Sequence, residues 1–198
     1  MIRIITIFPK MKAGTTNRKT EIIDVAARLF RQRGYSAVTM RDLANELGIK
    51  AASLYNHISS KQQILSEIIM SLAEDFTEGI EEIAATQTTA PDKLKAVVAQ
   101  HITLTADNPF KMATLNNDWM HLEDKLDTYL KLRNQYEKRF REIVLQGQKA
   151  GDLKVVSHEI LLFSILSTLR NLYLWIPKKA DLKKEKLIED LSEILLQG

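Results

Sequence analysis

The sequence predicts an all-α fold of about nine helices, in which a small three-helix head precedes a larger helical body. Apolar residues recur at intervals of three and four along most of the chain, which is the period of an amphipathic helix. The alternation typical of a strand occurs only in the short stretch RIITIF. Glycine is scarce, and each of the four prolines stands at a plausible helix boundary.

The composition is that of an ordinary soluble protein of 198 residues, with 45% hydrophobic and 27% charged residues. There is no cysteine, so disulfides and thiolate metal sites are excluded. The start, MIRIITIFPK, has an apolar core too short for a signal peptide, and no apolar run approaches the ~20 residues that span a bilayer. We therefore expect a cytoplasmic protein with no membrane partner.

Positive charge is concentrated at the beginning of the chain. Residues 1–61 hold eleven Lys and Arg against four Asp and Glu, whereas the remaining residues hold seventeen against twenty-one. A basic segment joined to a mildly acidic body favours contact with a polyanion. A solvated basic face explains the same charge about equally well.

The first helix is predicted over residues 18–33, because apolar residues recur on one face from Ile22 to Phe30 and Gly34 can end it in a left-handed conformation. A second, short helix is expected in VTMRDLANELG. Thr39 can cap it, and Asp42 three residues later supplies an aspartate variant of the capping box.

Gly48 closes this second helix, and a third helix is expected over residues 50–56. Two short helices joined by a turn of a few residues make a helix-turn-helix. Because this unit lies inside the basic segment, the two signals together favour DNA binding.

The body is predicted to begin with a long helix capped by Ser59 or Ser60, since each is followed three residues later by a glutamine. Further helices are expected over residues 91–106, with Pro91 in the first position, from 108–109 onward, and over 123–150, 157–176 and 181–196. Residues 157–176 are apolar on nearly every side, which predicts burial all round. The last two helices have more apolar surface than one small body covers, so we expect a homodimer with a symmetric four-helix interface.

The stretch NRKTEIIDVAARLFRQRGYSAVTMRDLANELGIKAASLYNHISSKQQIL closely resembles the DNA-binding region of the TetR family of bacterial transcriptional regulators. LF..RGY, T.RDLA..LGI, LYNH and SK..IL follow the order and spacing of that family. The resemblance implies a repressor that a small-molecule effector releases from a double-stranded DNA operator, with a homodimer formed through the last two helices. It implies an N-terminal arm over residues 1–16, a helix-turn-helix domain over 17–62, and an effector-binding and dimerisation domain over 63–198. A symmetric dimer predicts a near-palindromic operator.

The first turn of the recognition helix is expected to face the base edges in the major groove. The base-reading candidates are Lys50, Ala51, Ala52 and Ser53. Lys50 stands where the family usually has a capping Ser or Thr, and Ala52 where Gly is common. Lysine can donate to guanine and a methyl group can contact thymine, so base preference does not transfer from relatives.

Other polar residues of the head are predicted to contact the DNA backbone. The candidates are Arg18, Thr39, Met40, Arg41, Tyr55, Asn56, His57 and Lys61. Tyr55 and Asn56 can donate to phosphate oxygens, and Lys61 lies in the first turn of a helix. Arg18 and Arg41 are equally well explained as solvated surface charges, and the resemblance places His57 at a backbone-contacting position.

Beyond residue 70 the likeness is weaker. The stretch LRNQYEKRFREIVLQGQKAGDL, followed by an apolar helix ending near Trp-Ile-Pro, resembles a subgroup whose effectors are often acyl-CoA thioesters. An effector pocket has mostly apolar walls with few polar groups. The lining candidates are Phe110, Met112, Leu115, Trp119, His121 and Phe163, although plain hydrophobic core explains each of them at least as well.

Two rival readings come from other classes. A small helical enzyme would use His57 as a general base or a metal held by Asp118, His121 and Asp124, with a further ligand such as His158. No acidic orienting group lies near His57, and ordinary polar residues explain the second cluster better, so we expect no catalytic residue, metal or cofactor. The other rival is a helical ligand-binding module whose head does not bind DNA.

Overall fold

A computed structural model describes residues 18–179 and 181–197, and these residues form helices and connecting turns without a strand. The predicted all-α class is therefore confirmed. The expected N-terminal arm, residues 1–16, and the stretch RIITIF lie outside the described residues. The head contains α1 (Arg18–Arg33), α2 (Met40–Glu46) and α3 (Ala51–Tyr55).

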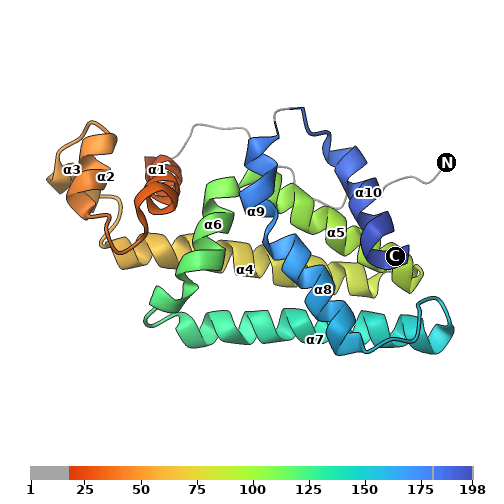
Figure 1. Cartoon of the computed structure of the whole chain (residues 1–198). Helices are drawn as coiled ribbons and strands as arrows, with labels where there is room; N and C mark the ends of the chain where they lie inside the picture. The colour runs from red at the N-terminus through yellow and green to blue at the C-terminus, as the bar shows by residue number, and fades with distance from the viewer. Residues whose placement is uncertain (1–17, 180, 198) are drawn as a thin grey trace.

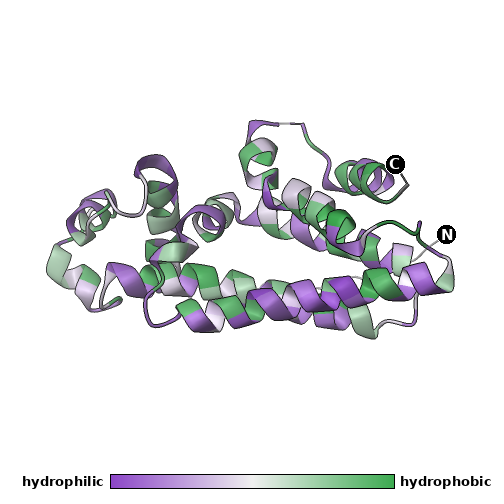
Figure 2. Ribbon diagram, turned by 60° about the horizontal axis from the view of Figure 1, so that its bottom comes forward, coloured by the Kyte–Doolittle hydropathy of each residue, from purple (hydrophilic) through white to green (hydrophobic). Residues whose placement is uncertain are grey.

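The body is built from the remaining helices. These are α4 (Lys61–Ala85), α5 (Ala90–Asp107), α6 (Pro109–Asp118), α7 (Leu126–Ala150), α8 (His158–Arg170), α9 (Leu172–Trp175) and α10 (Lys184–Gln197), with 3₁₀ turns η1 (Trp119–His121) and η2 (Ile176–Lys178). Helix α4 runs out of the head along the whole body beside α7, and α6 crosses from the head to α7 (Figure 1). Most helices carry both hydrophilic and hydrophobic residues, as packed amphipathic helices do (Figure 2).

The ends of the head helices follow the predicted local chemistry. The capping box is confirmed, since the Asp42 amide donates to Thr39 Oγ1 (3.2 Å) and the Thr39 amide donates to Asp42 Oδ2 (2.8 Å). Gly34 and Gly48 have φ angles of 82° and 65°, a region that residues with a Cβ rarely occupy. These turns fix the angles between α1, α2 and α3.

Two caps in the body refine the predictions. Ser60, not Ser59, caps α4, because its hydroxyl accepts the amide of Gln63 at 3.0 Å. Thr89 caps α5, so Pro91 occupies the second helical position, one later than predicted.

The predicted helix over residues 157–176 is broken at Asn171, which separates α8 from α9. The expectation of burial all round was wrong for the single chain. Leu162, Ile165, Leu166 and Leu169 are buried, whereas Ile160 and Phe163 are 66% and 71% exposed.

The expectation that no apolar run has spanning length was also wrong. His158–Lys178 has a mean hydropathy of 1.4 and is long and apolar enough to cross a membrane by composition. Helices at the core of soluble proteins meet the same criterion, and here 39% of the segment is already buried against the body. Arg170 in its middle forms an ion pair with Glu137 of α7, which fits packing within a protein.

Candidate functional site

The beginning of α3 forms an exposed surface at the tip of the head. Lys50, Ala51 and Ala52 are exposed and Ser53 is half-buried, while Leu54 is fully buried and holds the helix in place. Lys50 is the N-cap residue of α3, but its side chain makes no capping hydrogen bond. Its ammonium group also forms no ion pair with any residue that the structure describes, so it is free to meet a ligand.

Most of the remaining head candidates are also exposed or half-buried. Thr39, Arg41, Asn56 and His57 are exposed, Tyr55 is 53% exposed, and Met40 is half-buried. Arg18 instead lies on α1 in an ion pair with Glu21 at 2.6 Å.

The Lys61 side chain is directed into the head. Its Nζ atom donates to the carbonyl oxygens of Tyr35 and Val38, both at 2.8 Å, and to that of Ser36 at 3.4 Å. It also lies 4.3 Å from the centre of the Tyr35 ring. The pKa of Lys61 is lowered because burial penalises the charged amine. An ammonium group has three donors, and all three are used to hold the turn before α2.

Gln62, the next residue, links the head to the body. Its Oε1 atom accepts the Tyr35 hydroxyl at 2.6 Å, and its Nε2 atom donates to the His121 carbonyl at 2.9 Å. The ring of His121 stacks on Tyr35 with ring centres 5.4 Å apart. We call Tyr35, Gln62 and His121 the head–body clasp. His121 ends η1, the turn that begins with Trp119.

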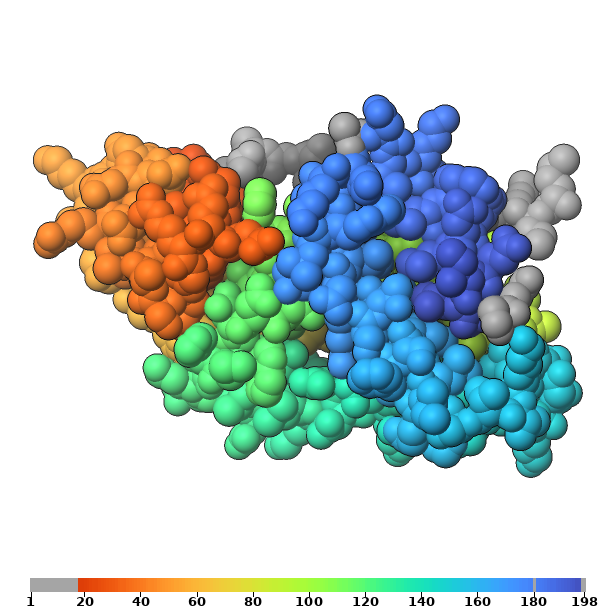
Figure 3. Space-filling view, in the orientation of Figure 1, coloured from red at the N-terminus to blue at the C-terminus, as the bar shows by residue number. Residues whose placement is uncertain are grey.

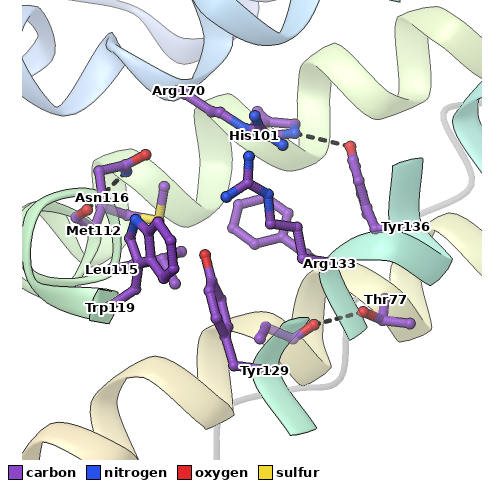
Figure 4. A pocket seen from close by; sticks show the side chains of 12 residues that line it. Thr77, His101, Met112, Leu115, Asn116, Trp119, Tyr129, Arg133, Tyr136 and Arg170 are labelled. Atoms are coloured by element: carbon purple, nitrogen blue, oxygen red, sulfur yellow. Dashed lines mark hydrogen bonds between the residues drawn. The ribbon is translucent and has the colours of Figure 1, made fainter. Parts of the chain in front are cut away.

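Trp119 is one of the residues that line a cavity of about 230 Å³ in the body (Figure 4). The residues that line it come from α4, α5, α6, η1, α7 and α8. They are Ala73, Phe76, Thr77, His101, Met112, Leu115, Asn116, Trp119, Tyr129, Arg133, Tyr136 and Arg170.

Three of the six predicted pocket residues line this cavity, namely Met112, Leu115 and Trp119. The other three lie elsewhere. Phe110 and Phe163 are 42% and 71% exposed, and His121 belongs to the clasp. Phe163 follows the buried Leu162, and one residue turns a helix by about 100°, enough to move a side chain from the inner to the outer face.

The polar residues of the cavity were absent from the sequence-based candidates. His101 Nε2 and the Tyr136 hydroxyl lie 2.8 Å apart, and both side chains are buried. Burial, assisted by the charge of Arg170, lowers the pKa of His101 to about 3, so the imidazole is neutral. Burial likewise raises the pKa of Tyr136. The sequence signal that could have identified this pair is a single histidine in the mostly apolar run LKAVVAQHITL.

Two arginines in the cavity wall share one carboxylate. Glu137 Oε1 accepts from Arg170 Nη2 at 2.7 Å and from Arg133 Nε at 3.3 Å. Burial alone would raise the pKa of Glu137, but the hydrogen bonds and charges of Arg170 and Arg133 lower it. Two guanidinium groups against one carboxylate leave this wall with a net positive charge.

The residues weighed for catalysis and metal binding have other contacts. The Ser59 hydroxyl, near His57, donates to Gln63 Oε1 at 2.8 Å. His158 Nε2 lies 3.2 Å from a carboxylate oxygen of Glu159 on α8, away from Asp118 and His121. Within residues 18–179 and 181–197, no group of three or more His, Asp or Glu side chains is arranged to hold a metal ion.

Comparison with known proteins covers both parts of the chain. Residues 22–68 match the profile of bacterial regulatory proteins of the tetR family, and residues 87–198 match that of the tetracyclin repressor-like C-terminal domain. The HTH-type transcriptional repressor KstR2 of Rhodococcus jostii is 30% identical over 72% of this chain and 71% of its own.

Two solved structures share the fold. KstR2 of Mycobacterium tuberculosis, a ketosteroid transcriptional regulator, superposes with a TM-score of 0.87 and 19% identity, covering 93% of this chain and 96% of that chain. AibR in complex with isovaleryl coenzyme A and operator DNA superposes with a TM-score of 0.77 and 22% identity, covering 91% of this chain and 98% of that chain.

Proposed function

The chain is a DNA-binding transcriptional regulator of the tetR family, and we propose that it is a homodimeric repressor released from a near-palindromic operator by a short acyl-CoA thioester. The head, residues 17–62, binds the operator, and the body, residues 63–198, binds the effector and the second subunit. The protein acts in the cytoplasm, where DNA and acyl-CoA esters meet.

The exposed first turn of α3 supports the assignment of base-reading residues. Lys50 has a free ammonium group that can donate to guanine, and Ala51 and Ala52 offer methyl groups to thymine. Ser53 can serve either partner of a base pair. The exposed Tyr55, Asn56 and His57 at the other end of α3 can then donate to phosphates.

The other residues proposed to contact the DNA backbone are supported to different degrees. Thr39, Met40 and Arg41 lie at the beginning of α2, and Arg41 carries a charge for a phosphate. Arg18 and Lys61 are already paired within the protein. We assign Lys61 to holding the head together, with any phosphate contact secondary to that role.

The cavity supports a small ligand with an anionic part. Its volume of about 230 Å³ lies below the ~300–1,000 Å³ of typical drug-sized sites, so it encloses a short acyl group and leaves the nucleotide outside. The net positive wall formed by Arg133, Arg170 and Glu137 favours the thioester oxygen of such a molecule. AibR, which has the same fold, binds isovaleryl coenzyme A.

The clasp supplies a route for release. A ligand that displaces Trp119 moves η1, and η1 is hydrogen-bonded through Gln62 to Tyr35 in the turn before α2. Release then requires that the ligand bind the DNA-incompetent arrangement more tightly than the DNA-bound one. Helix α4, which carries both Lys61 and the cavity residue Phe76, moves with the clasp.

The observation that carries the DNA-binding role is the unpaired Lys50 on an exposed α3. Fluorescence anisotropy with a fragment of the gene's own upstream region should show specific binding whose log affinity falls linearly with log salt concentration. Lys50→Ala should change the preference among operator variants, whereas Lys149→Ala, an equal charge loss at the far end of α7, should not. A flat salt response without a preferred sequence would favour a ligand-binding module that has lost DNA binding.

Isovaleryl-CoA is the first effector to test. It should release the operator at micromolar concentration, while coenzyme A or isovalerate alone should need far more. Failure of acyl-CoA esters of two to eight carbons to release the DNA would reject the effector class and leave the DNA-binding role intact.

A further inference from the structure

The cavity contains a polar pair that the protein itself does not fully satisfy. His101 is 4% exposed and Tyr136 6% exposed, and both line the cavity (Figure 4). The only hydrogen bond that either side chain makes with a described residue is the one between them. His101 Nδ1 is buried without a partner. Buried polar atoms are nearly always paired, so an orphan on a cavity wall needs an explanation.

Counting hydrogens shows what is missing. A neutral imidazole carries one N–H and the phenol carries one O–H, but the contact between them uses only one of these hydrogens. If the tyrosine donates to Nε2, the proton of the imidazole is on Nδ1 and has no acceptor. If Nε2 donates to the phenol, the hydroxyl hydrogen has no acceptor. In both arrangements the pair has one donor left over, and both of its residues line the cavity.

We propose that the effector carries a neutral oxygen, a carbonyl or hydroxyl group, on its enclosed part and that this oxygen accepts the spare hydrogen of the His101–Tyr136 pair. The inference builds on the proposed effector site and narrows its ligand from acyl groups in general to oxygenated ones, such as hydroxyacyl or oxoacyl groups. A plain hydrocarbon in the same space would keep the donor unpaired and away from water. A site built to hydrogen-bond an oxygen discriminates strongly against analogues that lack it.

Three neighbouring polar side chains of the cavity wall already have partners within the protein. Arg133 and Arg170 are engaged with Glu137, and the Thr77 hydroxyl donates to the backbone carbonyl of Ala73 at 2.7 Å. These groups therefore have partners in the absence of a ligand, whereas the His101–Tyr136 pair does not.

Matched probes test the preference with the full-length protein. Isothermal titration should show that acetoacetyl-CoA or 3-hydroxybutyryl-CoA binds at least about tenfold more tightly than butyryl-CoA, which differs only in the oxygen. Cyclohexanone and methylcyclohexane, followed by the chemical shifts of the cavity methyl groups, test the same preference without coenzyme A.

The decisive variant is His101→Leu combined with Tyr136→Phe. Replacing both partners by apolar groups of similar shape is close to neutral for folding, so the double variant should fold and bind DNA as before. It should bind each oxygenated probe and its hydrocarbon partner about equally. Thr114→Val, which removes a buried hydroxyl that already donates to the Phe110 carbonyl and lies outside the cavity lining, is the control and should keep the wild-type preference.

The outcomes separate this inference from the effector class. If acyl-CoA esters bind but neither oxygenated ester exceeds butyryl-CoA, the inference is overturned and the effector class stands. If no acyl-CoA binds but cyclohexanone is preferred in a way that depends on the pair, the inference stands and the effector class fails. Absence of preference in both probe sets rejects the inference, as does a preference that survives in the double variant.

Discussion

His101 combines a buried ring, a single partner and a strong electrostatic penalty for protonation. Its pKa is near 6.5 in an unfolded chain and falls to about 3 in the folded protein. Between these values the unfolded chain binds a proton that the folded protein does not, so folding stability decreases as the pH falls through this window. Above pH 6.5 both states are neutral at this position and the effect vanishes.

We therefore predict that His101→Leu makes the free energy of unfolding less dependent on pH below pH 6.5. Below pH 6.5 the wild type should lose about 1.4 kcal/mol per pH unit relative to the variant, the cost of one extra bound proton. Urea denaturation at pH 7.0 and 5.5 measures the difference. Equal slopes for wild type and His101→Leu would contradict the buried, neutral histidine.

Lys61 is predicted to contribute to stability as well as to DNA binding. Lys61→Met keeps most of the apolar stem but removes a charged donor from three carbonyl oxygens. Because the site is partly exposed and water can replace some of these bonds, the expected loss is about 1–2 kcal/mol of unfolding free energy. Lys149→Met serves as the surface control. A variant that unfolds like the wild type yet binds DNA weakly would mean that Lys61 acts chiefly on phosphate.

Local chemistry made the ends of the helices predictable from sequence. The Thr39–Asp42 capping box and the glycine turns depend on residues within four positions of one another. The break at Asn171 was not predictable from periodicity. Residues 157–176 are apolar on nearly every side, so their pattern has no apolar stripe that a break in the helix would interrupt. Lys61 illustrates the same limit, since its partners lie 23 to 26 positions earlier in the chain.

The cavity was only partly predictable because it depends on how six elements are rotated about their axes. Arg133 and Tyr136 lie on the cavity-facing side of α7, and a charged residue among apolar ones at helical spacing is a sign of a lined cavity. Their partners His101 and Arg170 come from α5 and α8, and no sequence spacing links these helices.

At the level of helices, the head–body clasp is predicted to transmit ligand binding. Gln62→Ala removes the hydrogen bonds to Tyr35 and His121 but leaves the base-facing residues of α3 in place. The concentration of isovaleryl-CoA that half-releases the operator should rise about fivefold or more, within the range of typical coupling energies, while affinity for DNA without ligand changes little.

Anisotropy titrations in which the ligand is added to the protein–DNA complex measure this coupling. Gln135→Ala provides the matched control, because Gln135 bonds to Glu81 on the outer side of the body and makes no contact with the head. Release of the Gln62→Ala complex at the wild-type concentration would show that the signal travels by another route, such as the Lys111–Asp24 ion pair between α6 and α1.

Across the whole molecule, charge and apolar surface are separated. The exposed α3 belongs to the basic segment, whereas α8, α9 and α10 form one continuous surface on the body (Figure 3). Ile160 and Phe163 of α8 and Ile194 of α10 are 66%, 71% and 68% exposed. In the homodimer that we propose, a second copy of the chain would bury the α8 face left open in one subunit.

Phe163 is the most exposed of these three side chains, so its replacement tests the dimer most directly. Phe163→Glu would bury a carboxylate in the proposed interface, and sedimentation should then show a monomer where the wild type is a dimer. Since each head reads one half-site, the monomer should bind a full operator at least about a hundredfold more weakly but bind a single half-site as the wild-type head does. Phe110→Glu, an equal change on α6, should remain dimeric. A monomeric wild type, or a Phe163→Glu variant that stays dimeric, would place the subunit interface elsewhere on the protein.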